Sequence, residues 1–182
     1  MYNKNVERNK KEFEEVVVQV DRVTRVVAGG KRLRFRATVV IGNRKGKIGI
    51  ASAKATEVSE AVKKAVVQAE KNIITVPIIN DTIPHRLETK FGAVRVMMKP
   101  APKGSGVAAG GAIRILAELA GIKNISSKIL GSPNKINNLK VGIKAFESFL
   151  DAKKSDSKLI KSEKRLLKGK NVKQSFKNSK KK

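Results

Sequence analysis

A glycine-rich segment in the second half of the chain has the residue types that could bind a phosphate. Gly104-Ser105-Gly106 and Gly110-Gly111 follow two prolines, and Arg114 lies shortly after them. Glycines before a helix start expose backbone amides, which attract anions together with the helix dipole. The segment would suit a nucleotide-binding enzyme, docking onto RNA phosphates or a partner protein, or simple close packing of a helix on a sheet. It matches neither Gly-x-x-x-x-Gly-Lys-Ser/Thr nor the dinucleotide Gly-x-Gly-x-x-Gly pattern in its proper setting, so alone it decides nothing.

Other residues give little support for catalysis. The single histidine, His85, lies in a strand-like stretch without a nucleophile or base beside it. Asp81 and Glu88 flank it at spacings that suggest no shared site. The chain has no cysteine, so the ligand set of a zinc site is missing. We therefore expect no catalytic residue, no metal and no cofactor.

The charge of the chain indicates a polyanionic partner. Lys and Arg number 41 against 15 Asp and Glu, which gives a formal net charge of +26. A compact fold with this surplus repels itself unless an anion lies near. No apolar run approaches the ~20 residues of a spanning helix, and the first residues resemble no signal peptide. We expect a cytoplasmic protein that binds nucleic acid. Aromatic residues are 4% of the chain, so binding should rest on phosphates and shape rather than on a stacking sheet.

Basic side chains gather at two predicted turns. One turn has the glycine pair Gly29–Gly30, and the next has the sequence from Gly42 to Gly46. Cations at a hairpin tip project clear of the sheet and reach phosphates, and we expect the two tips to be neighbours. An ordinary solvated turn is the alternative for each. The predicted RNA-binding residues are Arg22, Arg25, Gly29, Gly30, Lys31, Arg32, Arg44, Lys45, Lys47 and Lys54.

Hydrophobic periodicity predicts an α+β protein with two small domains. Alternating apolar residues predict strands over 16–20, 33–41 and 47–51, the second with a basic outer face at Arg34 and Arg36. Thr56 is the predicted N-cap of a helix whose apolar stripe ends at Ala69. The second half predicts a short strand at 76–79, then a hairpin of 83–90 with 93–99 around Phe91–Gly92. A helix stopped by Gly121, a strand over 122–130 and a final helix with a stripe over 136–150 follow.

The predicted division of the chain has four parts. Residues 1–13 are a basic N-terminal extension, 14–73 and 74–150 are the two domains, and 151–182 are a basic tail. The tail has 13 basic and 3 acidic side chains, and we expect it to be disordered alone. Extra RNA contact and a merely solvated tail are equally compatible with its composition.

Several motifs together resemble one known family. The landmarks are Gly30 to Asn43, Gly46 to Ala51, Lys54-Ala55, Glu57-Val58, Pro100-Ala101, Gly104-Ser105-Gly106, Ala109-Gly110-Gly111, Arg114, Ala120-Gly121-Ile122 and Gly131 to Asn134. With these landmarks in order, the chain from about Glu14 to Leu150 resembles the fifth protein of the small ribosomal subunit, of the bacterial type.

The resemblance implies a fold and a function. It implies a double-stranded-RNA-binding-like first domain and a second domain of an α/β sandwich fold that some small-molecule kinases share. A structural protein is implied, not an enzyme, with roles in subunit assembly, messenger RNA entrance and decoding accuracy. The implied partners are small-subunit ribosomal RNA, messenger RNA and the fourth and eighth small-subunit proteins, with no membrane and no homo-oligomer.

The resemblance also implies roles for particular loops. The loop around Gly29–Gly30 matches the region of the family that reaches RNA near the spectinomycin site. The glycine-rich segment around Gly104 matches the family's interface with the fourth protein, where changes affect decoding accuracy. The antibiotic-site loop comprises Thr24, Val27, Ala28, Gly29, Gly30 and Lys31. The partner interface comprises Lys103, Gly104, Ser105, Gly106 and Arg114.

Two departures from the family pattern affect these assignments. Ala28 stands where the family often has Lys, which removes one expected phosphate contact, and Ser52 stands where glycine is common. Two other functions stay open as alternatives. One is a phosphate-binding enzyme of the kinase-like fold, and the other is a free double-stranded-RNA-binding regulator.

Overall fold

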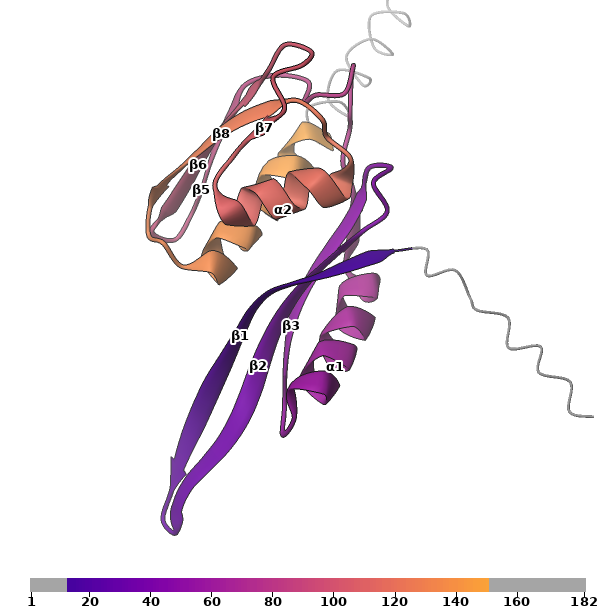
Figure 1. The fold of residues 1–182 in the computed structure, drawn as a ribbon. Helices are drawn as coiled ribbons and strands as arrows, with labels where there is room; N and C mark the ends of the chain where they lie inside the picture. Colours follow the sequence, from indigo (N-terminus) through magenta and orange to yellow (C-terminus); the bar gives the residue numbers. More distant parts are fainter. Residues whose placement is uncertain (1–12, 151–182) are drawn as a thin grey trace, which may run out of the picture.

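The structure is a computed structural model that describes residues 13–150. It contains two four-stranded sheets, each covered by helix on one face (Figure 1). The predicted α+β class is confirmed. The predicted tail and all but the last residue of the predicted N-terminal extension lie outside the described residues.

The first sheet is antiparallel, with the strand order β1-β2-β3-β4. A β-bulge between Val17 and Gln19 lets two residues of β1 share one position opposite β2. The strands are β1 (Glu14–Val27), β2 (Gly30–Gly42), β3 (Lys47–Ala55) and β4 (Ile73–Thr75).

Helix α1 (Val58–Lys71) covers one face of this sheet through small side chains. Ala61, Ala65 and Ala69 are fully buried against alternate residues of β2 and β3. Alanine at successive helical turns allows the helix axis to lie close to the strands. The predicted cap is wrong: Glu57 is the N-cap residue and makes no side-chain cap bond. The Thr56 hydroxyl donates to the Glu60 carboxylate at 3.3 Å and does not cap the helix.

The second sheet is mixed, with the order β5-β6-β8-β7, and β7 lies parallel to β8. Helix α2 and a last helix of residues 135–150 pack on one face of it. Gly121 ends α2 in the left-handed conformation, with φ 87°, as predicted. The elements are β5 (Leu87–Phe91), β6 (Val94–Pro100), β7 (Val107–Ala108), α2 (Gly111–Ala120) and β8 (Ile125–Gly131).

Several details of the second half differ from the prediction. The hairpin strand expected from residue 83 begins only at Leu87, so His85 lies in a bend before it, and the strand expected from residue 122 begins at Ile125. The expected strand at 76–79 is wrong, because β4 lies earlier and completes the first sheet by pairing with β3. Val76 is instead buried, and its amide donates to the Gly46 carbonyl at 2.6 Å. The expected boundary between residues 73 and 74 therefore falls inside β4. The two-residue strand β7 has no counterpart in the prediction.

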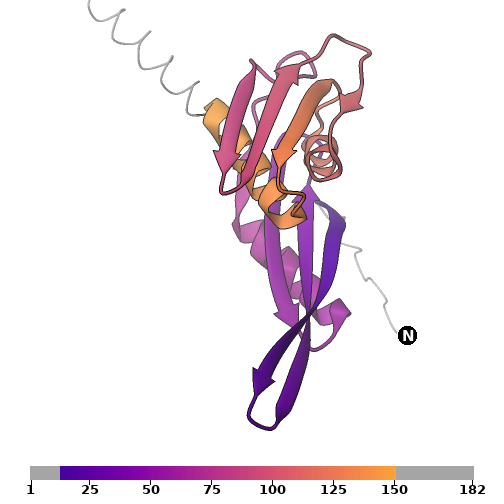
Figure 2. The same ribbon diagram turned by 90° about the vertical axis from the view of Figure 1, so that its left-hand side faces the viewer.

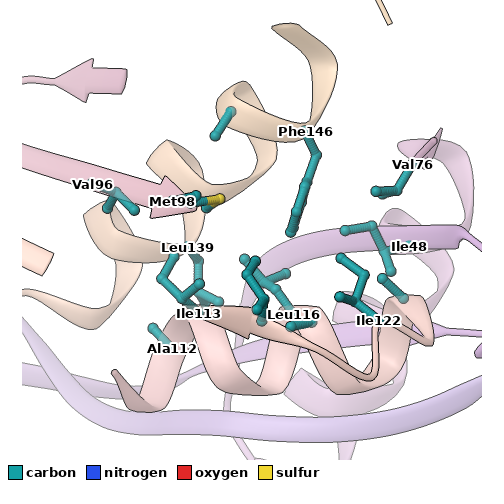
Figure 3. Close-up of a cluster of buried hydrophobic side chains, with 14 of the residues drawn as sticks. Ile48, Val76, Val96, Met98, Ala112, Ile113, Leu116, Ile122, Leu139 and Phe146 are labelled. Atoms are coloured by element: carbon teal, nitrogen blue, oxygen red, sulfur yellow. The ribbon is translucent and has the colours of Figure 1, made fainter. Parts of the chain in front are cut away.

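The two sheets share one hydrophobic core. Val40 and Ile48 of the first sheet belong to the same buried cluster as Leu116 of α2 and Phe146 of the last helix. Figure 3 shows Ile48 and Val76 beside Ile122, which follows α2. Because this core joins the halves, the first sheet is held in a fixed position against the second.

Candidate nucleic-acid interface

The residues of β2 alternate between two environments. Ala37, Val39 and Ile41 face α1, so the even-numbered residues lie on the other side of the sheet. On that side Val40 packs in the shared core, whereas Arg32 and Arg34 are exposed. We call the uncovered part the free face; it consists of Asp21, Val23, Arg25, Arg32, Arg34, Arg36 and Lys54.

A basic pocket of about 420 Å³ lies on the free face near the β1–β2 hairpin. None of its lining residues is acidic, and four are cationic. Arg25 and Arg32 are direct cross-strand partners, so two like charges stand opposite each other. Three of the four cations, Arg25, Arg32 and Lys54, are among the predicted RNA-binding residues. The lining residues are Val23, Thr24, Arg25, Val27, Arg32, Arg34 and Lys54.

The predicted site set omitted two cations of the free face, Arg34 and Arg36. The signal for them was present in the sequence, because they alternate with apolar residues along β2. The Arg36 guanidinium donates to the Asp21 carboxylate at 2.7 and 3.2 Å. The pKa of Asp21 is lowered by the hydrogen bond from Gln19, by Arg36 and by the nearby charge of Lys135. Asp21 thus offsets part of the positive charge at the inner end of the free face.

The tip of the β1–β2 hairpin is the most remote part of the first sheet. It is a two-residue loop, Ala28–Gly29, between the paired residues Val27 and Gly30. Figure 1 shows it extending beyond α1 and away from the second sheet. Gly30 has φ 128°, which favours glycine. The residues of the expected antibiotic-site loop, Thr24, Val27, Ala28, Gly29, Gly30 and Lys31, all lie in or beside this tip.

The cations predicted around this tip divide between its two faces. Arg25 and Arg32 belong to the free face. Arg22 pairs with Phe35 and Lys31 with Val26, so these two cations lie on the opposite side. All four side chains are exposed. The hairpin could therefore contact an anion on either side.

The expectation that the second hairpin projects beside the first is wrong. The two loops lie at opposite ends of β2, a strand of 13 residues that spans about 40 Å at about 3.3 Å per residue. The 42–46 loop packs against the end of α2, where the Arg44 amide donates to the Leu119 carbonyl at 2.9 Å and the Gly46 amide to Ala120 at 2.8 Å. This loop is a joint between the domains.

The side chains of the joint are also partly engaged. The Arg44 guanidinium donates to both Glu14 carboxylate oxygens, at 2.6 and 3.0 Å, and this pairing raises the pKa of Arg44. The Lys45 and Lys47 amides both donate to the Asn43 side-chain oxygen, at 2.8 and 3.0 Å, so one side chain orders the loop. The Lys45 and Lys47 side chains themselves are exposed.

The glycine-rich segment does not form a phosphate cradle. The amides of Gly104 and Gly106 donate to the side-chain oxygen of Asn124, at 3.0 and 3.2 Å, and the Ser105 amide donates to Pro102 at 3.2 Å. Asn124 is itself buried. The amides of the 104–106 turn are therefore already bonded within the chain, which argues against a phosphate cradle at this turn. Positive φ values of 90° and 68° explain the glycines at 104 and 106.

The start of helix α2 supports the third interpretation of this segment, in which glycine allows a helix to pack closely on the sheet. Gly110 is the N-cap of α2, and a Cβ there would meet the Ile129 side chain at 2.7 Å. The expected partner interface lies nearby: Lys103, Gly104, Ser105 and Arg114 are exposed, and Gly106 is half-buried. Residues 103–106 form a surface loop that Asn124 anchors, whereas Arg114 lies on α2.

The remaining candidates for chemistry have structural explanations. His85 packs edge-on against Phe149, with ring centroids 5.0 Å apart. Within residues 13–150 no group of three or more His, Cys, Asp or Glu could hold a metal ion. None of the helices in that range is long and apolar enough to cross a membrane.

Comparison with protein families identifies both halves of the chain. Residues 13–77 match the family described as Ribosomal protein S5, N-terminal domain. Residues 89–158 match Ribosomal protein S5, C-terminal domain. The first match coincides closely with the first sheet, and the second begins inside β5 and continues past the last described residue. Neither match says anything about a bacterial type. Proteins of this family are ribosome-associated and have ribosomal RNA as a partner. The chain therefore belongs to the ribosomal protein S5 family, and it is a non-enzymatic structural protein of the small ribosomal subunit.

Proposed function

We propose that the chain binds small-subunit ribosomal RNA through the free face and the tip of the β1–β2 hairpin. The observation that carries this proposal is the direct pairing of Arg25 with Arg32, in a pocket with no acidic lining residue. Like charges directly opposite each other destabilise a strand pair. The pair therefore opposes folding, and a bound phosphate chain would reverse its effect.

The same residues provide the test of this proposal. In the double variant Arg25→Gln with Arg32→Gln, the salt dependence of binding to small-subunit ribosomal RNA should become weaker by up to about two slope units, at ~0.9 per lost phosphate contact. The free energy of unfolding should stay unchanged or rise by up to ~1 kcal/mol. Titrations at several salt concentrations and thermal melts measure these two effects.

A matched control removes the same charge elsewhere. Lys99 and Lys128 are exposed on the second sheet, away from the free face. Lys99→Gln with Lys128→Gln should change the salt dependence much less. If both double variants weaken binding equally, binding reflects overall charge and not the free face.

We also propose the finer roles that the family resemblance implies. They are subunit assembly, contact with messenger RNA where it enters, and decoding accuracy, with the fourth and eighth small-subunit proteins as partners. The loop of Lys103, Gly104, Ser105 and Gly106, with Arg114, would contact the fourth protein. Its exposure and its anchoring by Asn124 support this role. The tip from Thr24 to Lys31 would lie near the antibiotic site.

Gly104→Asp tests the partner loop. A Cβ at this position meets no atom within 4 Å, although φ 90° disfavours any side chain by roughly 1 kcal/mol. The variant should stay folded and should disturb misreading frequency or docking of the fourth protein. Global unfolding as the main effect would contradict the interface role.

The alternative of a free RNA-binding regulator predicts that the chain does not travel with small subunits on a high-salt sucrose gradient.

A further inference from the structure

A groove of about 670 Å³ continues from the inner end of the free face. The side chains of β2 and β3 form one wall, the last helix forms another, and Phe91 at the end of β5 lies between them. Figure 2 shows the last helix running across the junction of the two sheets. The volume is within the range of ~300–1,000 Å³ that is typical of small-ligand sites.

Phe91 is an unusual residue for this surface. Its side chain is 39% exposed, the highest value for a phenylalanine in residues 13–150. The Lys140 ammonium stands over its ring, 5.8 Å from the centre, so a cation already faces one side of the π-system. The shared core already contains Phe146 and Phe149, so Phe91 is not needed to fill it. Phe91 therefore offers a π-surface to a ligand beside a cation.

The charge and chemistry of the groove favour a nucleotide. Arg36, Lys140 and Lys144 supply three cations, and Glu147 is the single acidic lining residue. Ile136 and Ile143 of the last helix add apolar wall, and exposed Ser52 adds a hydroxyl that can bond to the edge of a base. An aromatic face with apolar walls suits a base, whereas the surrounding cations suit its phosphates.

The groove is continuous with the proposed RNA interface. Arg36 lines the groove and belongs to the free face, and its direct partner on β3 is Lys54. Lys54 lines the basic pocket near the hairpin. A phosphate chain that crosses the free face toward the second domain would thus reach the groove next.

We propose that this groove takes one unstacked nucleotide of the bound RNA. Its base lies against Phe91 and the isoleucines, and its phosphates pair with Lys140, Lys144 and Arg36. This inference rests on the proposed RNA-binding function and adds a preference to it. The chain then favours an RNA stem with one unpaired nucleotide over the same stem fully paired.

The test uses the full chain and two RNA hairpins. One hairpin has a single unpaired adenosine in its stem, and the other lacks only that nucleotide. The wild-type chain should bind the first about tenfold more tightly, which is the lower part of the range for one base stacked on an aromatic ring. Phe91→Ala should remove this preference and leave binding to the paired hairpin unchanged.

Two further variants control for loss of folding and for surface hydrophobicity. Phe91→Leu retains an apolar side chain but lacks the ring, so it should also lose the preference. Leu130→Ala truncates another exposed apolar residue, 42% exposed on β8 and outside the groove, and should keep it. Circular dichroism and melts confirm that each variant is folded.

The outcomes separate this inference from the proposed function. Equal binding of both hairpins by the wild-type chain, or an intact preference in Phe91→Leu, overturns the groove proposal. If binding of the hairpins in either case still depends on Arg25 and Arg32, the proposed RNA interface on the free face stands. If the chain binds neither hairpin nor small-subunit ribosomal RNA, both proposals fail.

Discussion

The two hairpins that share β2 have similar sequences at their turns and different structures around them. Each turn combines glycines with basic residues. The tip at Ala28–Gly29 is held by the register of its own two strands. The 42–46 loop is held by hydrogen bonds to Leu119 and Ala120 at the end of α2. The role of a basic, glycine-rich turn is thus decided by what its backbone contacts, not by its composition.

The glycines of the two turns also serve different purposes. A Cβ at Gly29 or Gly30 would meet no atom within 4 Å, so only the turn conformation restricts these positions. A Cβ at Gly42 would collide with the carbonyl oxygen and side chain of Leu119. Gly42 therefore permits the close approach of β2 to α2. We therefore expect Gly29 at the remote tip to tolerate a side chain, whereas Gly42 at the joint should not.

The largest effect should come from adding a side chain at Gly42, where β2 lies close to α2. Gly42→Ala forces β2 away from α2 and should lower the free energy of unfolding by about 3 kcal/mol, the upper end for overpacking a buried contact. Gly29→Ala is the matched control at the remote tip and should change it by less than ~0.5 kcal/mol. Chemical denaturation measures both, and similar losses in the two variants would refute the distinction between tip and joint.

This contrast also shows where sequence reasoning succeeded and where it failed. The first tip and the end of α2 at Gly121 were predictable because turns and helix stops depend on adjacent residues. The joint depends on a bond between Arg44 and Leu119, which are 75 positions apart in the sequence. Likewise, Gly104 and Gly106 suggested a phosphate loop until Asn124, distant in sequence, was seen to occupy their amides.

The free face could be predicted only in part from the sequence. The alternation in β2 placed Arg34 and Arg36 together on one side, and this much was visible in the sequence. Whether α1 covers that side cannot be read from β2 alone, since it depends on how the chain crosses the sheet. The groove at Phe91 depends further on the packing of the last helix, so its position could be found only in the fold.

The next effect concerns RNA affinity and separates the cations of the two turns. Lys31→Gln with Arg32→Gln should weaken binding to small-subunit ribosomal RNA about tenfold and reduce the salt slope by up to about two. Arg44→Gln with Lys45→Gln should have less than half this effect, because Glu14 already pairs with Arg44. Salt titrations of the two double variants measure the difference. Equal effects would mean that the joint contributes as much to the RNA footprint as the tip.

The smallest effect concerns Asp21, where β1 leaves the packed part of the sheet and the free face begins. Asp21→Asn removes the negative charge that pairs with Arg36, so it should raise RNA affinity a few-fold and lower the free energy of unfolding at neutral pH by at most about 1 kcal/mol. The pKa of Asp21 is lowered in the folded chain, chiefly by the Gln19 hydrogen bond and by Arg36. Its stabilising contribution is therefore present above the unfolded pKa of ~3.9 and is lost as the pH falls through the folded value.

The stability difference between the wild-type chain and Asp21→Asn should follow the same titration. It should be constant from neutral pH down to about pH 5 and should shrink as the pH falls further, below the unfolded pKa and through the lowered pKa of the folded chain. Thermal melts of both proteins across this range measure it. A difference that persists unchanged at the acid end would show that Asp21 acts through packing and not through its charge. The boundary between the packed and free parts of β2 would then not be electrostatic.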